Sequence, residues 1–534
     1  MKKTLFKKSL TFAAVVVITI LTIKSICYSQ VVLETKEKSK QINESGNYPT
    51  ENSFAYQSDT IKGTPDEKIV KSNSDPANKN DQIKSIDSTK YSMFGDLLRD
   101  DPVYNKKYPL WIPMVEVLGV HVSLGLINRY VFNSDFARVG INSWKYNIKA
   151  GWEWDADRFA MNFLGHPYSG SLNFISARSN GYNFWESIPF AIGGSLLWEY
   201  FGENTRPSFN DVINTPISGA GFGELFYRLS SNILDDRTTG TERFFREFGA
   251  AVFSPTRFFN RLIQGKLSRV TSEEVYQKQP LNIEISAGLR KLNDGSSFWT
   301  GPQNIYLNGQ LDYGYALEKR EWKPFDYFKV RVDMNLGVGR KIVDNITGYG
   351  ILFGKNVQCG DLEMVIGGFQ HYNYFDNTTF ELGAIGLGPG IMSKYPLSRE
   401  SYLFTNFHLA IVPLAGNSTR LGPDTTQVRD YNFGGGAEGK IECGLNLNWA
   451  SIQFIGYYFW IHTYGGTAGV DIKGNNYIGI IRPRITFRII RNLNIGFEQM
   501  VYYSDRYTAN FGDYHAVRTE QRIYLMLNVG NFKL

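Results

Sequence analysis

The stretch FKVRVDMNLGVG, residues 328–339, alternates apolar and polar side chains at every second position. Its apolar row is Phe328, Val330, Val332, Met334 and Leu336, and its polar row is Lys329, Arg331, Asp333 and Asn335. Successive side chains of a β-strand point to opposite faces of the sheet. The pattern therefore predicts a strand with one apolar face and one charged face.

The same alternation recurs from about residue 280 to the end of the chain. It is clear in LNIEISAGLR (281–290), KIECGLNLNW (440–449) and IRPRITFRII (481–490). In the last of these, Arg482, Arg484 and Arg488 share one face. The repeats predict about twelve antiparallel strands, with an error of about two either way, and an even count is typical of bacterial barrels.

Two architectures can use strands of this kind. A soluble β-sandwich turns the apolar rows inward, whereas a membrane barrel turns them towards lipid and the charged rows towards the lumen. The strands are long enough for a tilted membrane crossing, and aromatic residues gather near strand ends in YYFWIHTY (457–464) and MVYYSDRY (500–507). QRIYLMLNVGNFKL (521–534) provides a last strand on which a barrel can close. Residues 280–534 are predicted to form a transmembrane β-barrel.

The N-terminal region predicts export. Residues 1–29 combine four early lysines with an apolar core at residues 9–23, and cleavage before Gln30 fits a secretory signal peptide. Residues 30–90 are rich in Lys, Ser, Asn, Asp and Glu, which predicts a disordered linker. The expected location is the outer membrane, with outer-membrane lipid and the barrel-assembly machinery as partners. An envelope protein is a further partner to consider.

Composition excludes several classes of protein. The chain has three cysteines, of which Cys359 and Cys443 remain after signal cleavage, so a disulfide scaffold is excluded. The six histidines are scattered, and no Cys/His spacing is typical of zinc. A net charge of +6 over 534 residues is too diffuse for nucleic-acid binding. No metal and no cofactor are expected.

Residues 91–275 do not alternate and are predicted to form a helical domain. Apolar segments interrupted by Pro or Gly favour helices that fill the barrel lumen as a plug or cap its periplasmic mouth. The segment 241–266 combines Phe with Arg, which fits either a membrane interface or an ordinary amphipathic helix on a protein core. Gly219 and Gly223 form a small-residue stripe that allows another helix to approach closely. The charged lumen fits either a barrel filled by salt bridges or a passive channel for anions.

The stretch SLLWEYFGENTRPSFNDVINTPISGAGFGELFYRLSS, residues 195–231, sets carboxylates and amides into apolar sequence. One hypothesis is an envelope-lipid hydrolase with His166 as general base and Ser169 or Ser171 as nucleophile, the histidine being oriented by Glu199 or Asp211. The other is structural: the polar groups cap helices and bind one another, so that they hold the domain together or form an interaction module. The further members of this polar cluster are Arg178, Asn180, Glu186, Glu203, Ser208, Asn214 and Glu224.

A series of motifs runs through this region: GHPYSGS (165–171), ARSNGYNFWES (177–187), WEYFGE (198–203), PSFND (207–211), GELFYRLSS (223–231) and SPTRFFNRL (254–262). Together they resemble the bacterial family catalogued as domain of unknown function 3943. The resemblance covers about residues 155–266. It implies a conserved type of domain attached to the barrel, but no reaction.

Overall fold

The computed structural model describes residues 107–534 except for Ala156 and residues 294–302, 318–321, 337–341, 378–379, 419–430, 466–472, 510–512 and 533–534. The predicted signal peptide (1–29) and linker (30–90) lie outside the described residues and stay predictions. Within the described part, the helices run from Trp111 to Ile263 and the strands from Leu281 to Phe532.

Twelve antiparallel strands form one closed barrel in which each strand pairs with its neighbours in sequence and β1 pairs with β12. The prediction of a barrel of about twelve strands is confirmed. The strands are β1 Leu281–Asn293, β2 Gln303–Tyr313, β3 Phe328–Asn335, β4 Val343–Cys359, β5 Leu362–Asp376, β6 Glu381–Pro396, β7 Tyr402–Ser418, β8 Tyr431–Asn446, β9 Ala450–Gly465, β10 Gly474–Ile490, β11 Leu493–Thr508 and β12 Tyr514–Phe532.

Ion pairs between strands that are not neighbours show which face of the wall is the inner one. Arg482 on β10 and Arg522 on β12 both bind Asp333 on β3, at 3.1 and 2.8 Å. Lys329 on β3 lies 2.8 Å from Glu442 on β8. Contacts of this kind have to cross the lumen, so the charged rows face inward and the apolar rows face outward, as the alternation predicts.

The two ends of the barrel differ in the length of their connections. Short turns at residues 360–361, 397–401, 447–449 and 491–492 lie at one end, together with the longer segment 314–327. The strand pairs β3 and β4, β7 and β8, and β9 and β10 are separated by longer breaks in the sequence, and the strand ends that flank these breaks lie at the other end. Bacterial outer-membrane barrels have short periplasmic turns and longer extracellular loops. We therefore call the first end periplasmic and the second extracellular.

In the described part of the chain, seven α-helices precede the barrel: α5 Trp111–Leu126, α6 Ile141–Ala150, α7 His166–Arg178, α8 Phe184–Leu197, α9 Phe209–Ile233, α10 Gly240–Phe253 and α11 Pro255–Ile263. π-helical turns at Ile127–Val131, Met161–Gly165 and Trp198–Gly202 extend α5, precede α7 and follow α8. The central helix α9 is buried along most of its length and packs closely on α7. A Cβ atom at Gly219 would overlap the backbone at Gly170, which explains the small residues at this crossing.

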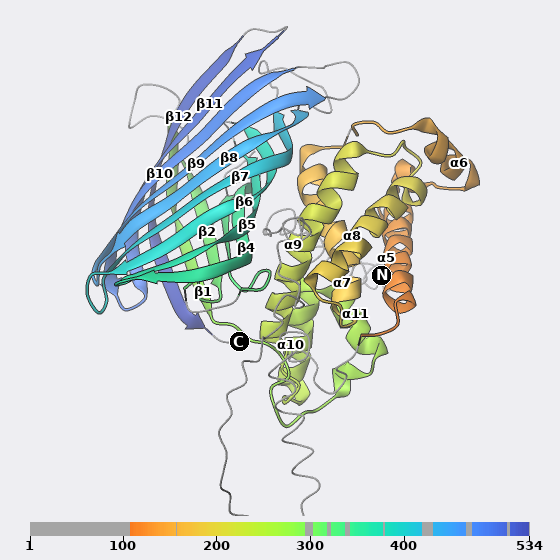
Figure 1. Ribbon diagram of the computed structural model, residues 1–534, viewed down its shortest axis with the longest axis horizontal. Helices are drawn as coiled ribbons and strands as arrows, with labels where there is room; N and C mark the ends of the chain where they lie inside the picture. Colours follow the sequence, from red (N-terminus) through yellow and green to blue (C-terminus); the bar gives the residue numbers. More distant parts are fainter. Residues whose placement is uncertain are drawn as a thin grey trace, which may run out of the picture.

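The helical domain lies against the outside of the barrel wall (Figure 1). On β5, His371 and Asn373 point into the lumen, where both face Glu438 of β8. The residues between and beside them point outward, and these contact the helices: Gln370 donates to the Ile217 carbonyl at 3.0 Å, and the Tyr372 hydroxyl donates to the Phe163 carbonyl. The prediction that the helices fill the lumen or cap the periplasmic mouth is therefore wrong for the described helices.

Glycines on the outer face of the wall make this contact possible. Phe163 packs over Gly383 of β6 and Gly416 of β7, where a Cβ atom would overlap its ring. Phe222 of α9 packs on Tyr372 with ring centroids 4.8 Å apart. The alternation predicts which rows face outward, but it does not distinguish a lipid-covered patch from a patch that other parts of the chain cover.

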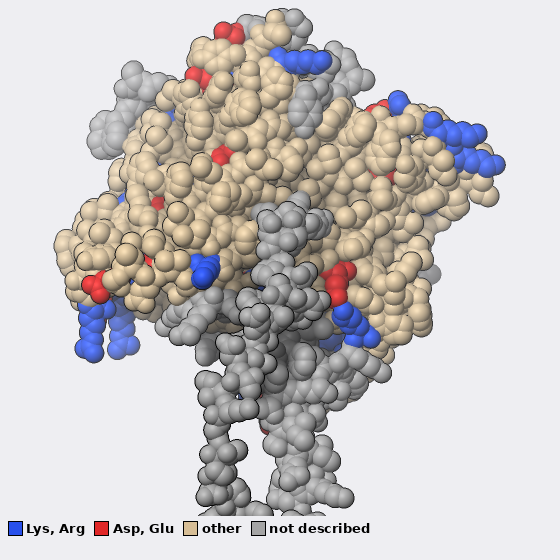
Figure 2. All heavy atoms as spheres, viewed as in Figure 1, with Lys and Arg blue, Asp and Glu red and all other residues tan. Residues whose placement is uncertain are grey.

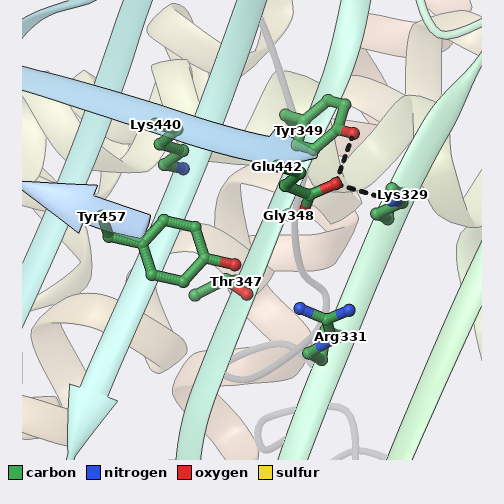
Figure 3. A pocket seen from close by; sticks show the side chains of 8 residues that line it. All are labelled: Lys329, Arg331, Thr347, Gly348, Tyr349, Lys440, Glu442 and Tyr457. Atoms are coloured by element: carbon green, nitrogen blue, oxygen red, sulfur yellow. Dashed lines mark hydrogen bonds and ion pairs between the residues drawn. The ribbon is translucent and has the colours of Figure 1, made fainter. Parts of the chain in front are cut away.

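Side chains of the wall crowd the middle of the lumen, and a cavity of about 90 Å³ lies near its periplasmic end, beside Glu284 and Arg488. An apolar cluster occupies the extracellular half of the lumen, with Phe375, Phe459, Ile478 and Tyr502 among its members. Below it, Lys329, Arg331, Lys440 and Glu442 line a cavity of about 10 Å³, which is room for about one water molecule (Figure 3).

We expect the protein to conduct no ions through its barrel. Ion pairs cross the lumen, and an apolar cluster lies on their extracellular side. In a planar lipid bilayer, the purified protein should give no single-channel currents. Steady currents that disappear when an added polyanion blocks the lumen would contradict this expectation and favour the anion channel.

We also expect the wall glycine at 383 to be required for docking of the helical domain. Gly383→Ala places a methyl group against the Phe163 ring, and overpacking of this kind costs about 1–3 kcal/mol. Limited proteolysis should then cut the helical domain at lower protease concentrations while the barrel stays heat-modifiable on gels. Gly309→Ala is the matched control, since a Cβ atom at Gly309 meets no atom within 4 Å. Equal protease resistance of the two variants would contradict the packing argument.

Candidate functional site

The polar cluster gathers where three segments meet near the extracellular end of the barrel. The first turns of α7 and α9 lie beside the segment 152–158 and beside the start of β8. Burial brings several ionisable groups together here, because the apolar sequence on either side of each group packs into the bundle and the wall.

His166, the first residue of α7, lies between two carboxylates. Its Nε2 atom is 3.4 Å from Asp157 and 3.5 Å from Asp211. The Asp157 side chain is 52% exposed, whereas those of His166 and Asp211 are 12% and 2% exposed. The imidazole therefore connects a carboxylate at the surface to one that is fully buried.

A second set of groups holds the buried carboxylates in place. The backbone N–H of Ser208 donates to Glu199 at 2.7 Å. The Asn210 side chain donates to Asp211 at 2.8 Å and to Asn162 at 2.9 Å. Polar groups in such a network are fixed in position, so the geometry around His166 is organised before any ligand binds.

The barrel wall contributes directly to the site. The Tyr431 hydroxyl, at the start of β8, donates to the backbone carbonyl of Asp157 at 2.8 Å and accepts from Asn162 at 2.5 Å. The site is thus built jointly by the helical domain and the outside of the barrel, on the extracellular side.

Negative charge dominates the electrostatics of the site. Burial disfavours the charged form of His166, but the hydrogen bond and charge of Asp157, with Asp155 and Glu199 beyond it, raise its pKa to about 9. Burial, together with the charges of Asp155 and Glu199, raises the pKa of Asp211 well above its usual value. Both groups lie at the rim of the bundle, beside the extracellular ends of the strands. At neutral pH His166 is therefore the cation of the site.

One group of described residues has ligand atoms close enough to hold a metal ion. Asp155, Asp157 and His166 each offer one ligand atom, and these atoms lie within 4.8 Å of one another. Oxygen and imidazole ligands of this kind suit a divalent cation such as Mn²⁺ or Zn²⁺. Without a metal, the same carboxylates stabilise the protonated form of the His166 imidazole.

The predicted nucleophiles Ser169 and Ser171 lie in the first turns of α7, on the same helix as His166. The Ser171 hydroxyl is buried and donates to the Tyr168 carbonyl at 2.7 Å, within its own helix. No hydrogen bond among the described residues joins His166 to Ser169 or Ser171. Of the five residues proposed for catalysis, the structure brings together His166, Glu199 and Asp211.

The other predicted polar residues divide between this site and a separate network. Ser208 and Asn214 belong to the site, and Glu203 lies next to it, where its carboxylate accepts from Thr205 at 2.8 Å. Arg178 and Glu224 form a buried ion pair at 2.8 Å deeper in the bundle.

That deeper network ties the helices together and to the barrel. Arg228 binds Glu224 at 3.0 Å and Asp326, in the periplasmic β2–β3 connection, at 3.1 Å. Asn180 donates to Glu116 of α5 at 2.7 Å, and Glu186 forms a capping box with Asn183 at the start of α8. These four predicted residues (Arg178, Asn180, Glu186 and Glu224) have structural partners.

Five residues of the site were missed by the sequence analysis: Asp155, Asp157, Asn162, Asn210 and Tyr431. Asp155 and Asp157 lie in WEWDADRF (152–159), where two carboxylates follow a pair of tryptophans at i, i+2 spacing. This Asp-x-Asp spacing, just before a helix that starts with His, was a signal that could have been used.

A known family model matches the part of the chain that contains the site. Residues 151–256 match the family model described as Domain of unknown function (DUF3943). The resemblance predicted from the motifs is thereby confirmed. The DUF3943 domain contains every residue of the site except Tyr431 of the barrel. No curated protein matches the chain.

Several solved structures of outer-membrane proteins are similar in part. The NanC porin is 8% identical to this chain, with a TM-score of 0.26. The match covers 46% of this chain and 100% of the porin chain. OmpT, an outer membrane protein of Vibrio cholerae, is 8% identical, with a TM-score of 0.22, over 47% of this chain and 97% of its own. The toluene transporter TbuX of Ralstonia pickettii is 7% identical, with a TM-score of 0.22, over 47% of this chain and 90% of its own.

Three carboxylates raise the pKa of His166, and we expect Asp157 to contribute more than Asp155 or Glu199. In detergent-solubilised protein labelled with ¹⁵N-histidine, the His166 resonance should titrate with a midpoint of about 9. Asp157→Asn removes both the hydrogen bond to a charged acceptor and its charge, so the midpoint should move down. The His515 resonance, from an exposed residue on β12, is the internal control. An unchanged midpoint in Asp157→Asn would contradict the assignment.

Proposed function

We propose that this protein is an outer-membrane hydrolase whose substrate is an ester of an envelope lipid in the outer leaflet. The observation that carries the proposal is the position of His166 between Asp157 and Asp211, near the extracellular end of a barrel with an apolar outer wall. In this proposal the filled barrel is an anchor and a wall for the site, and it transports nothing.

The charge balance of the site assigns the acid and the base. His166 is surrounded by carboxylates and is protonated at neutral pH, so it suits the role of general acid. Asp157 carries the exposed carboxyl group of the pair, so it suits the role of base towards a water molecule. Asp211 holds the imidazole from its buried side.

The reaction then balances without a serine nucleophile. Asp157 removes a proton from water, whose oxygen forms a bond to the acyl carbon of the ester. The bond between that carbon and the alcohol oxygen breaks, and His166 donates its proton to the departing oxygen. Transfer of the proton from Asp157 back to His166 restores both groups. The products are a carboxylic acid and an alcohol.

A structural role for the same residues remains the second candidate, and a specific observation favours it. Asn162 and Tyr431 join the helical domain to the barrel at the centre of the cluster, with hydrogen bonds also to Asp155 and Asp157. If these groups only hold the domain on the wall, the domain is an interaction module for another envelope component. Substitutions of these residues would then lower the stability of the protein and leave the lipid composition of the cells unchanged.

We expect His166→Gln to abolish hydrolysis while the protein still folds. Glutamine keeps a hydrogen-bonding side chain but cannot donate a proton as an acid, and loss of such a group lowers a rate by about 100-fold or more. Lipids extracted from cells that express each variant, compared by mass spectrometry, should show the intact ester accumulating with His166→Gln and Asp157→Asn.

The matched control is His515→Gln, which changes an exposed histidine that is paired with Asp505 in the barrel. Heat-modifiable migration of the barrel and protease resistance of the helical domain establish folding for every variant. A lipid profile that is identical for wild type, His166→Gln and cells without the protein would refute the hydrolase.

A further inference from the structure

The helices α10 and α11 turn their apolar side chains outward. Their exposed residues are Phe244, Phe245, Phe248, Phe259, Leu262 and Ile263. An amphipathic helix of a water-soluble domain buries this face and exposes its charges. Here the orientation is the reverse, which resolves the two alternatives for segment 241–266 against an ordinary amphipathic helix on a protein core.

The charged faces of the same helices are buried and paired. Arg243 and Arg261 lie 2.8 and 2.6 Å from Glu247, and Arg261 also lies 2.9 Å from Asp236. Arg257 donates to Ser230 and to Ser231 of α9, in each case at 2.7 Å. The ionic groups of this part of the domain therefore bind one another, away from the outer surface.

Helix α5, on the far side of the bundle from the barrel, carries a long apolar stripe (Figure 1). Trp111, Met114, Val115, Leu118 and Val122 are all about half exposed or more. The helical stretch Trp111–Val131 has 21 residues and, among the described helices, is long and apolar enough to cross a membrane. At 1.5 Å per residue it spans about 31 Å, which matches the hydrocarbon core of a bilayer.

The outer wall of the barrel is apolar as well. Exposed apolar residues on β1, β10 and β12, such as Leu289, Ile481 and Ile523, form the lipid-facing rows of the wall. On the face seen in Figure 2, uncharged residues cover most of the barrel and of the helical domain, and charged residues gather mainly towards the upper and lower rims.

We infer that the helical domain lies within the bilayer beside the barrel, with its outer faces on the acyl chains of lipids. The inference rests on the outer-membrane location in the proposed function. Acyl chains are the occupant because the exposed stripe of α5 has the length of the hydrocarbon core, the buried faces hold the charges, and the barrel beside the helices also exposes apolar residues. An apolar patch that extends over three helices would be costly in water. Such an arrangement also leaves the His166 site at the level of the outer-leaflet headgroups.

Spin labels on single cysteines test this inference in the full chain, reconstituted into phosphatidylcholine–phosphatidylglycerol vesicles. The background carries Cys27→Ser, Cys359→Ser and Cys443→Ser. Labels at Leu118→Cys on α5 and Phe248→Cys on α10 report on the helical domain, with Val122→Cys in reserve if Leu118→Cys fails to fold. Ile523→Cys on the outer wall is the lipid reference, and Glu400→Cys in the periplasmic turn 397–401 is the water reference.

Collision rates with oxygen and with a water-soluble nickel chelate distinguish the outcomes. We expect the oxygen-to-nickel ratio at both helical positions to equal that at position 523 and to exceed that at position 400 several-fold. Nickel access at the helical positions, with position 523 still in lipid, would overturn the inference and leave the barrel in the membrane. Low access to both reagents would also overturn it, since a protein surface would then cover the helices. Nickel access at position 523 as well would refute the membrane location itself.

Discussion

Ion pairs that cross the lumen fix the orientation of the strands, and every other feature of the molecule depends on that orientation. Asp333 is bound by arginines from β10 and β12, and Lys329 reaches Glu442 on β8, so the charged rows are enclosed. A buried charge that lost its partner would be strongly destabilising, which excludes the reverse orientation. Once the charged rows face inward, the apolar rows have to face either lipid or another part of the chain.

Part of the outer wall faces another part of the chain. The sequence analysis did not predict this contact between the helical domain and the outside of the barrel. Strands such as β1 and β10 alternate clearly because one face meets lipid and the other meets charged groups. In β5, residues Gly368 to Asp376 are all buried, and the sequence GFQHYNYFD does not alternate. A strand covered by protein on both faces has no reason to alternate. The loss of alternation in β5 and the many glycines of β6 were therefore signs of a docked domain.

For the candidate site, the sequence predicted the region and part of the residue set. His166, Glu199 and Asp211 could be chosen because an ionisable group in apolar sequence has to be paired or functional. Their relation to Asp157 and Tyr431 could not be predicted, since it depends on how the segment 152–158 lies against the start of β8. The serines were chosen from their distance along the chain, but on a helix the Ser171 hydroxyl has a nearer acceptor in the Tyr168 carbonyl. Local hydrogen bonding of this kind often satisfies a serine within a helix.

In the proposed function the barrel does not transport, and its wall instead completes the site. Buried polar groups need partners within the protein, and Asn162 finds them in Asp155, Asn210 and Tyr431. Tyr431 of β8 supplies one of them, and Gly383 and Gly416 let Phe163 approach the wall closely enough for that bond to form. The rigid sheet thus holds the segment that carries Asp157 against α7, where His166 begins the helix. Close packing on one side and hydrogen bonding on the other therefore fix the separation between His166 and Asp157, which the proposed acid–base roles of these two residues require.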